Sequence, residues 1–309
     1  MNYRVLGRTG LRVSMLGFGG APLGSAYGPT TQDESTAAVR AALAAGINYF
    51  DTAPYYGATT AETALGRALV GVPREAYLLA TKVGRYGLDD FDFSAARVAA
   101  SVDESLARLG CGHLDLIQVH DLEFGHLEQI VAETLPALDR LRAGGKVRFI
   151  GITGLPLRAL TVVHAHWPTD TVLSYCHHCL HDTTLADAAP AWRACQSGVI
   201  NASPLAMGLL SAAGPPAWHP APPALKQACA AAAAFCRARG RSLAEVALQF
   251  ALTDPPADTT LVGMRTTEEV RLNVAAAAAP PDLEFIATLQ KRFAPVRNLT
   301  WPSGRPENN

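Results

Sequence analysis

The 309-residue chain has few cysteines, almost no net charge and no long apolar run. Six cysteines spread over this length exclude a disulfide-stabilised scaffold. Lys and Arg number 26 against 27 Asp and Glu, so the chain lacks the basic surface of a protein that binds nucleic acid or an anionic membrane. The most apolar tract, residues 228–235, is too short to span a bilayer. These absences leave a small molecule as the expected partner.

The amino terminus also lacks the apolar run of a targeting segment, and we expect a cytoplasmic protein with reduced thiols. The hydrophobic fraction of 49% excludes a disordered chain and allows a sizeable core. The length suits either two domains of ordinary size or one α/β barrel of roughly 250 residues with additions.

Short β-branched or aromatic runs alternate with amphipathic stretches rich in Ala and Leu. Strands are predicted at residues 15–19, 47–51, 77–83, 114–120, 147–153, 171–176, 198–203 and 259–263. Helices are predicted near residues 32–45, 60–70, 95–109, 127–143, 156–164, 184–196, 224–252 and 267–278. Strict alternation implies parallel strands joined by right-handed crossovers. We therefore predict one α/β domain over residues 1–309 with the fold of a (β/α)8 TIM barrel. The barrel is expected at about 15–279. An N-terminal β-hairpin at about 3–12 precedes it, and a helical or irregular tail at about 280–309 follows it.

An open, doubly wound sheet is the alternative architecture. Such a sheet usually carries the dinucleotide fingerprint G-x-G-x-x-G after its first strand. Residues 17–22 read Gly-Phe-Gly-Gly-Ala-Pro, with a proline at the place of the third glycine. The fingerprint fails, so a dinucleotide would have to bind in another way.

Four residues with acid–base capacity fall at the carboxyl ends of three successive predicted strands, where barrel enzymes carry their chemistry. Asp51 ends one strand and Tyr56 follows it in the loop, while Lys82 and His120 end the next two strands. A phenol with a pKa of about 10 is a poor base at neutral pH unless a nearby cation stabilises the phenolate. Lys82 can supply that cation, Asp51 can hold Lys82, and His120 can orient a substrate oxygen.

Several motifs resemble, in order, those of the aldo-keto reductase family. They are residues 46–57, 81–83, 114–120, 145–151, 203–205 and 262–273. The resemblance covers nearly the whole chain. It implies a (β/α)8 barrel, an extended nicotinamide dinucleotide and a catalytic tetrad of Asp51, Tyr56, Lys82 and His120. Within this tetrad, Tyr56 is implied to be the general acid/base and Lys82 to modify its pKa.

Further segments are similar to a sugar-oxidising branch of the family, namely residues 151–157, 173–177, 203–210 and 296–304. This similarity implies NAD-dependent oxidation of the anomeric carbon of an L-aldose to its lactone, with L-galactose as the first candidate. L-Fucose or a D-threo-aldose is the alternative substrate. Two further functions stay open, that of an NADPH-dependent reductase of aldehydes or ketones and that of a non-catalytic, cofactor-binding regulatory subunit. The family-typical state is a monomer.

The resemblance also assigns cofactor contacts. Thr153 and Gly154 stand where the family commonly has Ser-Asn, and Ser174 stands where many members have Gln. Ser203, Leu205 and Gly208 match the loop around the pyrophosphate, where backbone N–H groups can donate.

The segment that opens the last barrel helix decides between NAD and NADP. Gly263 and Glu269 occupy positions that are basic in NADP-binding members, and Asn273 ends the matching segment. Glu269 would repel a 2′-phosphate, whereas Arg265 could bind one. The balance favours NAD over NADP.

The cluster Cys176-His177-His178-Cys179-Leu180-His181 contains zinc-ligand types, but alternate side chains of a strand point to opposite faces, so we predict no metal site. Loop position makes five residues candidates for the substrate pocket. They are Tyr55, Tyr86, Asp121, His178 and Trp301. Trp301 has an equally good interpretation as a residue that packs the tail onto the barrel.

Overall fold

The computed structural model describes all residues from 1 to 309, and its centre is a closed barrel of eight parallel strands. The strand order around the barrel is β10-β3-β4-β5-β6-β7-β8-β9, with β10 pairing to both β9 and β3. The bounds are β3 Leu16–Gly19, β4 Tyr49–Asp51, β5 Leu78–Val83, β6 Leu114–Val119, β7 Val147–Gly154, β8 Thr171–Tyr175, β9 Gly198–Ala202 and β10 Thr259–Gly263. All eight predicted strands are present, so the predicted (β/α)8 fold is confirmed.

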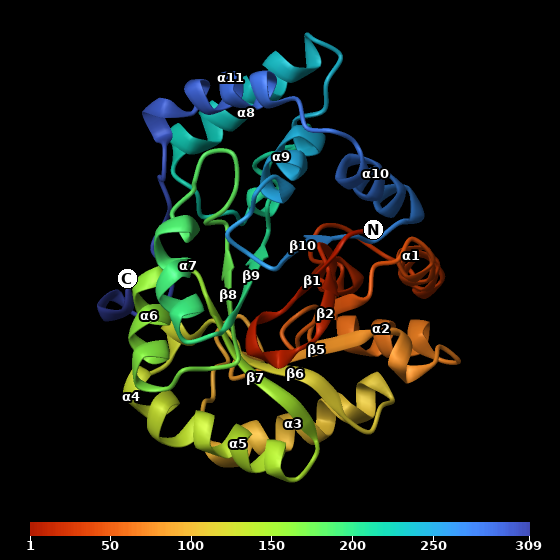
Figure 1. Ribbon diagram of the computed structural model, residues 1–309, viewed down its shortest axis with the longest axis vertical. Coiled ribbons are helices and arrows are strands. Elements are labelled where there is room, and N and C mark those ends of the chain that lie inside the picture. The colour runs from red at the N-terminus through yellow and green to blue at the C-terminus, as the bar shows by residue number, and fades with distance from the viewer.

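Helices surround the barrel (Figure 1). Their bounds are α1 Gln32–Ala44, α2 Thr60–Leu69, α3 Ala95–Leu109, α4 Leu127–Gln129, α5 Leu135–Ala143, α6 Leu157–His166, α7 Leu185–Ala194, α8 Pro223–Arg237, α9 Leu243–Leu252, α10 Thr267–Ala278 and α11 Leu283–Arg292. A π-helical turn, Ile130–Thr134, joins α4 to α5. None of these helices has the length and apolar character needed to cross a membrane.

The helix predicted over residues 224–252 is wrong in one respect, because the segment forms two helices, α8 and α9. The break falls at Gly240, whose φ of +67° a right-handed helix cannot accommodate. Helix α8 packs against α11 of the tail, and the two lie side by side at one end of the molecule (Figure 1). The predicted tail therefore forms a helical layer over this part of the barrel.

The hairpin pairs β1, Tyr3–Val5, with β2, Arg12–Ser14, and so ends two residues beyond its predicted limit. Its turn closes the amino-terminal end of the barrel. Leu6 packs into the barrel interior, and an added Cβ on Gly7 would come within 2.2 Å of the backbone nitrogen of Gly198 at the start of β9. The hairpin crosses the barrel in the ribbon view (Figure 1).

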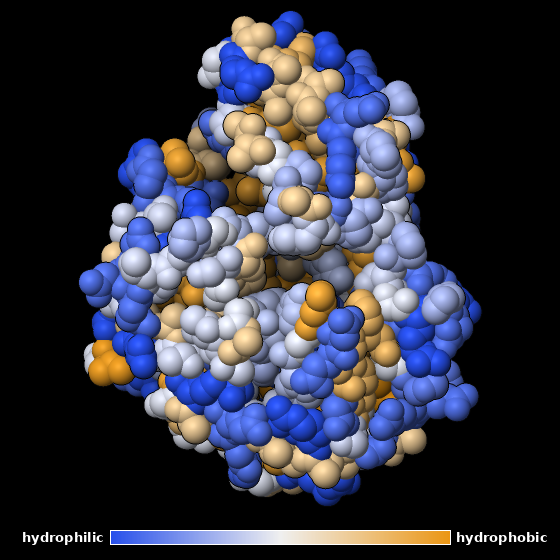
Figure 2. Space-filling view, turned by 180° about the vertical axis from the view of Figure 1, so that it is seen from behind, coloured by the Kyte–Doolittle hydropathy of each residue, from blue (hydrophilic) through white to orange (hydrophobic).

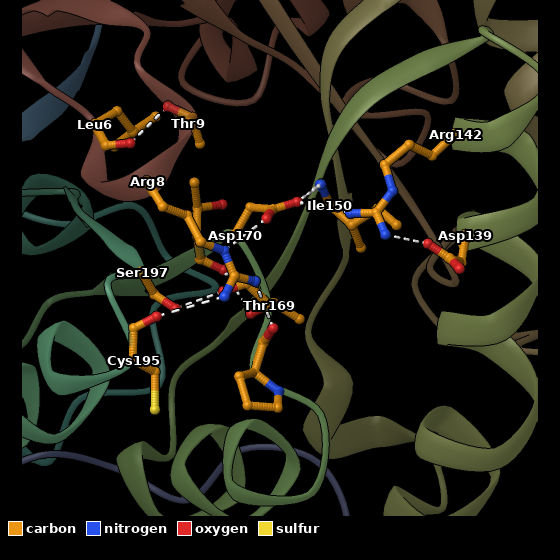
Figure 3. A network of polar contacts seen from close by, with 12 residues as sticks. Leu6, Arg8, Thr9, Asp139, Arg142, Ile150, Thr169, Asp170, Cys195 and Ser197 are labelled. Atoms are coloured by element: carbon orange, nitrogen blue, oxygen red, sulfur yellow. Dashed lines mark hydrogen bonds and ion pairs between the residues drawn. The ribbon is translucent and has the colours of Figure 1, made fainter.

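Asp170 anchors this hairpin through a network of polar contacts (Figure 3). Arg8 Nε donates to Asp170 Oδ1 at 2.9 Å, and Arg8 Nη2 donates to the Pro168 carbonyl at 2.7 Å. Asp170 Oδ2 accepts from the backbone N–H of Ile150 at 3.0 Å and from Arg142 Nη1 at 3.3 Å. A buried carboxylate that accepts several hydrogen bonds is compensated for the loss of water, so this network stabilises the closed end.

A side-chain acceptor for a backbone N–H, like Asp170 for Ile150, recurs around the amino-terminal end of the barrel. Next to the start of every second barrel strand, a side-chain oxygen accepts a backbone N–H from the preceding barrel strand or from the residues just before it. The four contacts are Ser14 to Asn48 at 2.8 Å, Leu79 to Asp115 at 2.9 Å, Ile150 to Asp170 at 3.0 Å and Val199 to Asp258 at 3.0 Å. These four contacts add side-chain links to the backbone ladder at this end and so help to fix the register of neighbouring strands.

The barrel interior is filled by one apolar layer from alternate residues of the strands. Tyr49, Ala80, Leu116, Leu173, Ile200 and Leu261 form this layer together with side chains of the hairpin. Successive side chains of a strand point to opposite faces, so the residue two positions further along faces inward as well. On β4, β5 and β6 those residues are Asp51, Lys82 and Gln118. The apolar layer is thus the floor of a polar site.

Candidate active site

Asp51, Lys82 and Tyr56 meet above the apolar layer at the carboxyl end of the barrel. Lys82 Nζ donates to Asp51 Oδ1, to the Thr52 carbonyl at 2.8 Å and to the Tyr56 hydroxyl at 3.3 Å. Lys82 and Asp51 are almost fully buried, at 2% and 4% exposure. The ammonium therefore donates its three hydrogen bonds to a carboxylate, a carbonyl and the phenol oxygen.

The burial of this group controls its charges. Burial alone disfavours the ammonium, but the Asp51 carboxylate and the Tyr56 oxygen outweigh it and raise the pKa of Lys82. Burial raises the pKa of Tyr56, and the Lys82 ammonium opposes that rise. Tyr56 is therefore a protonated phenol whose phenolate has one cation, Lys82, within hydrogen-bonding distance. This is the arrangement that a proton-transfer tyrosine needs.

His120 lies beside the phenol, with its ring perpendicular to that of Tyr56 and the centroids 5.5 Å apart. Burial lowers the pKa of His120 to about 3, so the imidazole is neutral at physiological pH and can donate one hydrogen bond without carrying charge. Its Nδ1 is buried without a partner in the protein. The predicted tetrad is therefore brought together in one place by β4, β5 and the segment after β6.

Gln118 joins this group, although it was not among the predicted site residues. Its Nε2 donates to Asp51 Oδ2 at 2.7 Å, which leaves each oxygen of that carboxylate with one donor. The signal was available in the sequence, because Gln118 lies two residues before His120 and must face the same side of its strand.

A second polar group borders His120. Arg85 Nη1 donates to Asp121 Oδ2 at 2.5 Å, and the same oxygen lies 3.7 Å from His120 Nε2. The Arg85 guanidinium lies 3.8 Å from the centroid of the Tyr55 ring, which in turn packs near His120. Two predicted pocket residues, Tyr55 and Asp121, are thus beside the tetrad. Arg85 was not predicted, because only tertiary contact reveals it.

The other three pocket candidates make no hydrogen bond, ion pair or ring contact with the tetrad. The Tyr86 hydroxyl accepts from the Gly84 N–H at 3.1 Å, and Arg97 of α3 covers its ring at 4.0 Å. His178 packs on Phe250 of α9, with the ring centroids 5.1 Å apart, and both of its ring nitrogens are unpartnered. These contacts tie Tyr86 and His178 to the surrounding helices.

Trp301 is 6% exposed and packs edge-on against His219 of the loop before α8, with the centroids 4.9 Å apart. It belongs to the apolar cluster formed by α8, α9 and the tail. This position matches the interpretation in which Trp301 holds the tail on the barrel.

The cysteine and histidine cluster after β8 is held by protein contacts. His177 Nε2 contacts the Leu155 carbonyl at 2.8 Å and its Nδ1 contacts Asp182 at 3.1 Å, while Cys179 Sγ lies 3.4 Å from His181 Nδ1. No three His, Cys, Asp or Glu side chains of the chain are placed to hold a metal ion together.

The three residues predicted to contact the nicotinamide, Thr153, Gly154 and Ser174, do not all face the interior of the barrel. Thr153 lies at the end of β7, and its Oγ1 accepts from the Asp121 N–H at 3.2 Å. An added Cβ on Gly154 would come within 2.6 Å of Glu123 Oε2, so the asparagine common in the family would require the Glu123 carboxyl group to move. Ser174 follows Leu173 of the inner layer and so faces the helices, with its hydroxyl buried and unpartnered.

The loop predicted to surround the pyrophosphate has an unusual backbone. Ser203, Ala206, Met207 and Gly208 all have positive φ, between +46° and +99°. Such turns expose backbone N–H groups in a concave arrangement that binds anions, and the Leu205 N–H makes no hydrogen bond within the protein. This loop follows β9 at the carboxyl end of the barrel. Its exposed N–H groups suit the pyrophosphate of a dinucleotide.

At the adenosine end, Arg265 and Glu269 form an ion pair. Arg265 Nε lies 3.2 Å from Glu269 Oε1, and Arg265 Nη1 donates to the Tyr27 carbonyl at 3.1 Å. Gly263 ends β10, where an added Cβ would come within 2.9 Å of Pro22 Cγ, so a basic side chain has little space. Asn273 lies half-buried one turn beyond Glu269 on α10.

The space-filling view shows the face turned away from the viewer in Figure 1. A hollow with hydrophobic residues in its wall opens near the middle of this face (Figure 2). The face is otherwise mixed, without a broad field of one kind of residue. A binding site formed by a few placed groups agrees with the net charge of −1.

Residues 15–292 match the model of the aldo/keto reductase family, and the chain belongs to this family. It is therefore an oxidoreductase enzyme, and its family binds a nicotinamide dinucleotide. The chain is 50% identical to the L-galactose dehydrogenase of Arabidopsis thaliana, over 99% of this chain and 98% of that protein. It is 31% identical to the D-threo-aldose 1-dehydrogenase of a Pseudomonas species, over 95% and 97% of the two chains.

A solved structure agrees with this classification. The holo form of an aldo-keto reductase from Bacillus halodurans superposes with a TM-score of 0.80 at 26% identity, covering 100% of this chain and 99% of the other. The resemblance to the family, the barrel and the enzyme class expected from the sequence are confirmed.

Proposed function

We propose that the protein is an NAD-dependent aldose 1-dehydrogenase that oxidises C1 of L-galactose to the aldonolactone. One observation carries this proposal: the identity of 50% to an L-galactose dehydrogenase extends over nearly both whole chains. The closed barrel and the tetrad at its carboxyl end support it. L-Fucose or a D-threo-aldose is the alternative substrate, favoured by the likeness to the Pseudomonas enzyme.

The side chains support a definite division of labour. Tyr56 takes the proton of the anomeric hydroxyl, and the Lys82 ammonium at 3.3 Å stabilises the phenolate that must form first. Asp51 holds Lys82 in place, and Gln118 in turn holds Asp51. Neutral His120 donates a hydrogen bond to a substrate oxygen at C1. A bound nicotinamide dinucleotide would supply the acceptor for the hydride on C1, so that sugar and NAD would become lactone, NADH and a proton.

The choice of NAD rests on the Arg265–Glu269 pair. A 2′-phosphate needs a free cation, but the Arg265 charge is compensated by Glu269 and its fork is turned toward the Tyr27 carbonyl. The six free cysteines suit a reducing compartment, and a cytoplasmic monomer remains part of the proposal.

A panel of L- and D-aldoses with NAD and NADP tests this function through the formation of reduced cofactor. We expect the highest kcat/KM for L-galactose with NAD and the lactone as product. A higher kcat/KM for small aldehydes with NADPH would contradict the proposal and favour a reductase. Absence of turnover with tight cofactor binding would favour a regulatory subunit. Glu269→Gln, which frees Arg265, is expected to improve kcat/KM for NADP, and Glu268→Gln, one residue earlier on the exposed side of α10, is its matched control.

A further inference from the structure

The proton transfer proposed above does not use the Arg85–Asp121 pair beside the tetrad. Asp121 Oδ2 is occupied by Arg85, but Asp121 Oδ1 makes no hydrogen bond in the protein and is not among the polar atoms sealed from solvent. The Oδ2 atom of the same carboxylate lies 3.7 Å from His120 Nε2, which places Oδ1 on the neighbouring side of the group. A hydrogen-bond donor for the substrate and an unused acceptor therefore lie next to each other at the reacting centre.

The carboxylate is held rigidly in this position. Asp121 has a left-handed backbone, with φ +47° and ψ +54°, and its N–H donates to Thr153 Oγ1 at 3.2 Å. Left-handed non-glycine residues of this kind persist where the surroundings hold them, and they are common at functional sites. A group fixed in this way loses little entropy when it binds a ligand.

The guanidinium that orients the carboxylate is enclosed by aromatic rings. Arg85 lies 3.8 Å from the Tyr55 centroid, 5.2 Å from that of Phe91 and 5.0 Å from that of Phe124. The Phe91 and Phe124 rings stack at 4.4 Å. Because rings on three loops fix the guanidinium, its Nη1 keeps Asp121 Oδ2 engaged and leaves Oδ1 for a ligand.

We propose that Asp121 recognises the hydroxyl on C2 of the sugar, next to the carbon that is oxidised; this inference rests on the proposed function. His120 Nε2 donates to the oxygen on C1 and Asp121 Oδ1 accepts from the hydroxyl on C2, because oxygens on adjacent carbons have the close spacing that these two groups present. Arg85 positions the carboxylate and neutralises its charge. Asp121 thereby separates polyhydroxylated substrates from simple aldehydes.

The test compares L-galactose with 2-deoxy-L-galactose, which lacks only the hydroxyl in question. Intrinsic reactivity at C1 differs between the two sugars, so the change in the ratio of their kcat/KM values between enzymes is measured. A hydrogen bond to a charged group contributes on the order of tenfold to a hundredfold. We expect the preference for L-galactose to fall by this factor in Asp121→Gly, which keeps the left-handed backbone.

Asp254→Gly is the matched control, because Asp254 is also a left-handed aspartate, with φ +43°, but is exposed on the loop before β10. It should keep the preference of the wild type. If Asp121→Gly does not fold, the Asp121→Asn variant is used instead. Its amide oxygen is uncharged, so the preference for L-galactose over 2-deoxy-L-galactose should fall several-fold. An unchanged ratio in a folded Asp121 variant would overturn the inference.

The outcomes for the two proposals are separate. Oxidation of L-galactose by the wild type with NAD tests the proposed function without any variant. If another aldose proves to be the substrate, the same ratio is measured with that sugar and its 2-deoxy analogue. Loss of discrimination in the Asp121 variant then supports the inference, and retention overturns it.

Discussion

At the amino-terminal end of the barrel, Asp170 accepts from Arg8, Arg142 and the Ile150 N–H, so neither of its oxygens lacks a donor. At the carboxyl end, His120 Nδ1 and Gln118 Oε1 are buried without any partner. The Arg side chains at the closed end reach solvent, at 35% and 42% exposure, whereas Lys82 is 2% exposed.

This difference separates stability from reactivity within one fold. Charges that are fully paired and partly solvated help to fix the strand register and have no further capacity to react. Charges that are buried with incomplete partners keep shifted pKa values and free hydrogen-bonding atoms, which a substrate can use. The two ends should therefore respond differently to substitution.

Apart from removal of the Tyr56 hydroxyl itself, the largest expected effect is at Lys82. Lys82→Met removes the cation that stabilises the Tyr56 phenolate, so we expect kcat/KM for sugar oxidation at neutral pH to fall by roughly 10²-fold or more. Because burial raises the pKa of Tyr56 and Lys82 opposes it, the residual activity should require a higher pH than the wild type does. The pH profile of kcat/KM measures both effects. A profile with unchanged pH dependence would show that Lys82 does not act on Tyr56.

A large loss of stability is expected at the other end. Asp170→Ala leaves the buried Ile150 N–H without an acceptor and detaches Arg8 of the hairpin. The free energy of unfolding should fall by about 2–3 kcal/mol, while kcat of the folded enzyme stays near the wild-type value. Urea unfolding and turnover at a permissive temperature check this. A fall in kcat without a fall in the free energy of unfolding would contradict the claim that this end of the barrel contributes to stability and not to turnover.

A smaller effect, on stability, is expected at Glu123, a buried carboxyl group near the carboxyl end of the barrel. Burial and the neighbouring Asp121 raise the pKa of Glu123 to about 8, and its Oε1 accepts from Leu155 and from Ser303 of the tail. Between about pH 4.3 and 8 the carboxyl group of Glu123 is ionised in the unfolded chain but not in the folded chain. The free energy of unfolding therefore falls as the pH rises through this range.

Glu123→Gln cannot ionise, so its melting temperature relative to the wild type should be higher at pH 8 than at pH 5. Glu128→Gln on α4 makes the same replacement of a carboxyl group by an amide at an exposed site and should show no such trend. A constant difference between the Glu123 variant and the wild type across this range would mean that Glu123 is ionised in the folded protein.

The parts of the fold that local pattern determines were predictable. Each strand is a short apolar run, and the alternation of runs with amphipathic segments defines the barrel. The tetrad was predictable because three of its members end strands. The break at Gly240 was not foreseen, because the Ala-rich apolar pattern continues on both sides of it.

Other features depend on contacts between distant segments. The enclosure of Arg85 requires rings from residues 91 and 124, which no local pattern brings together. The orientation of His178 toward Phe250 depends on where α9 packs. Gln118 is the exception, since strand alternation from His120 suffices to locate it.

The most direct test of the catalytic role of the carboxyl end is the turnover of Tyr56→Phe with NAD and L-galactose, measured beside its affinity for NAD. This change removes one oxygen whose protein partner is Lys82. Turnover should fall roughly 10²- to 10⁴-fold while the affinity for NAD and the melting temperature stay close to those of the wild type. Unchanged turnover in the folded variant would contradict the assignment of Tyr56 as the general acid/base.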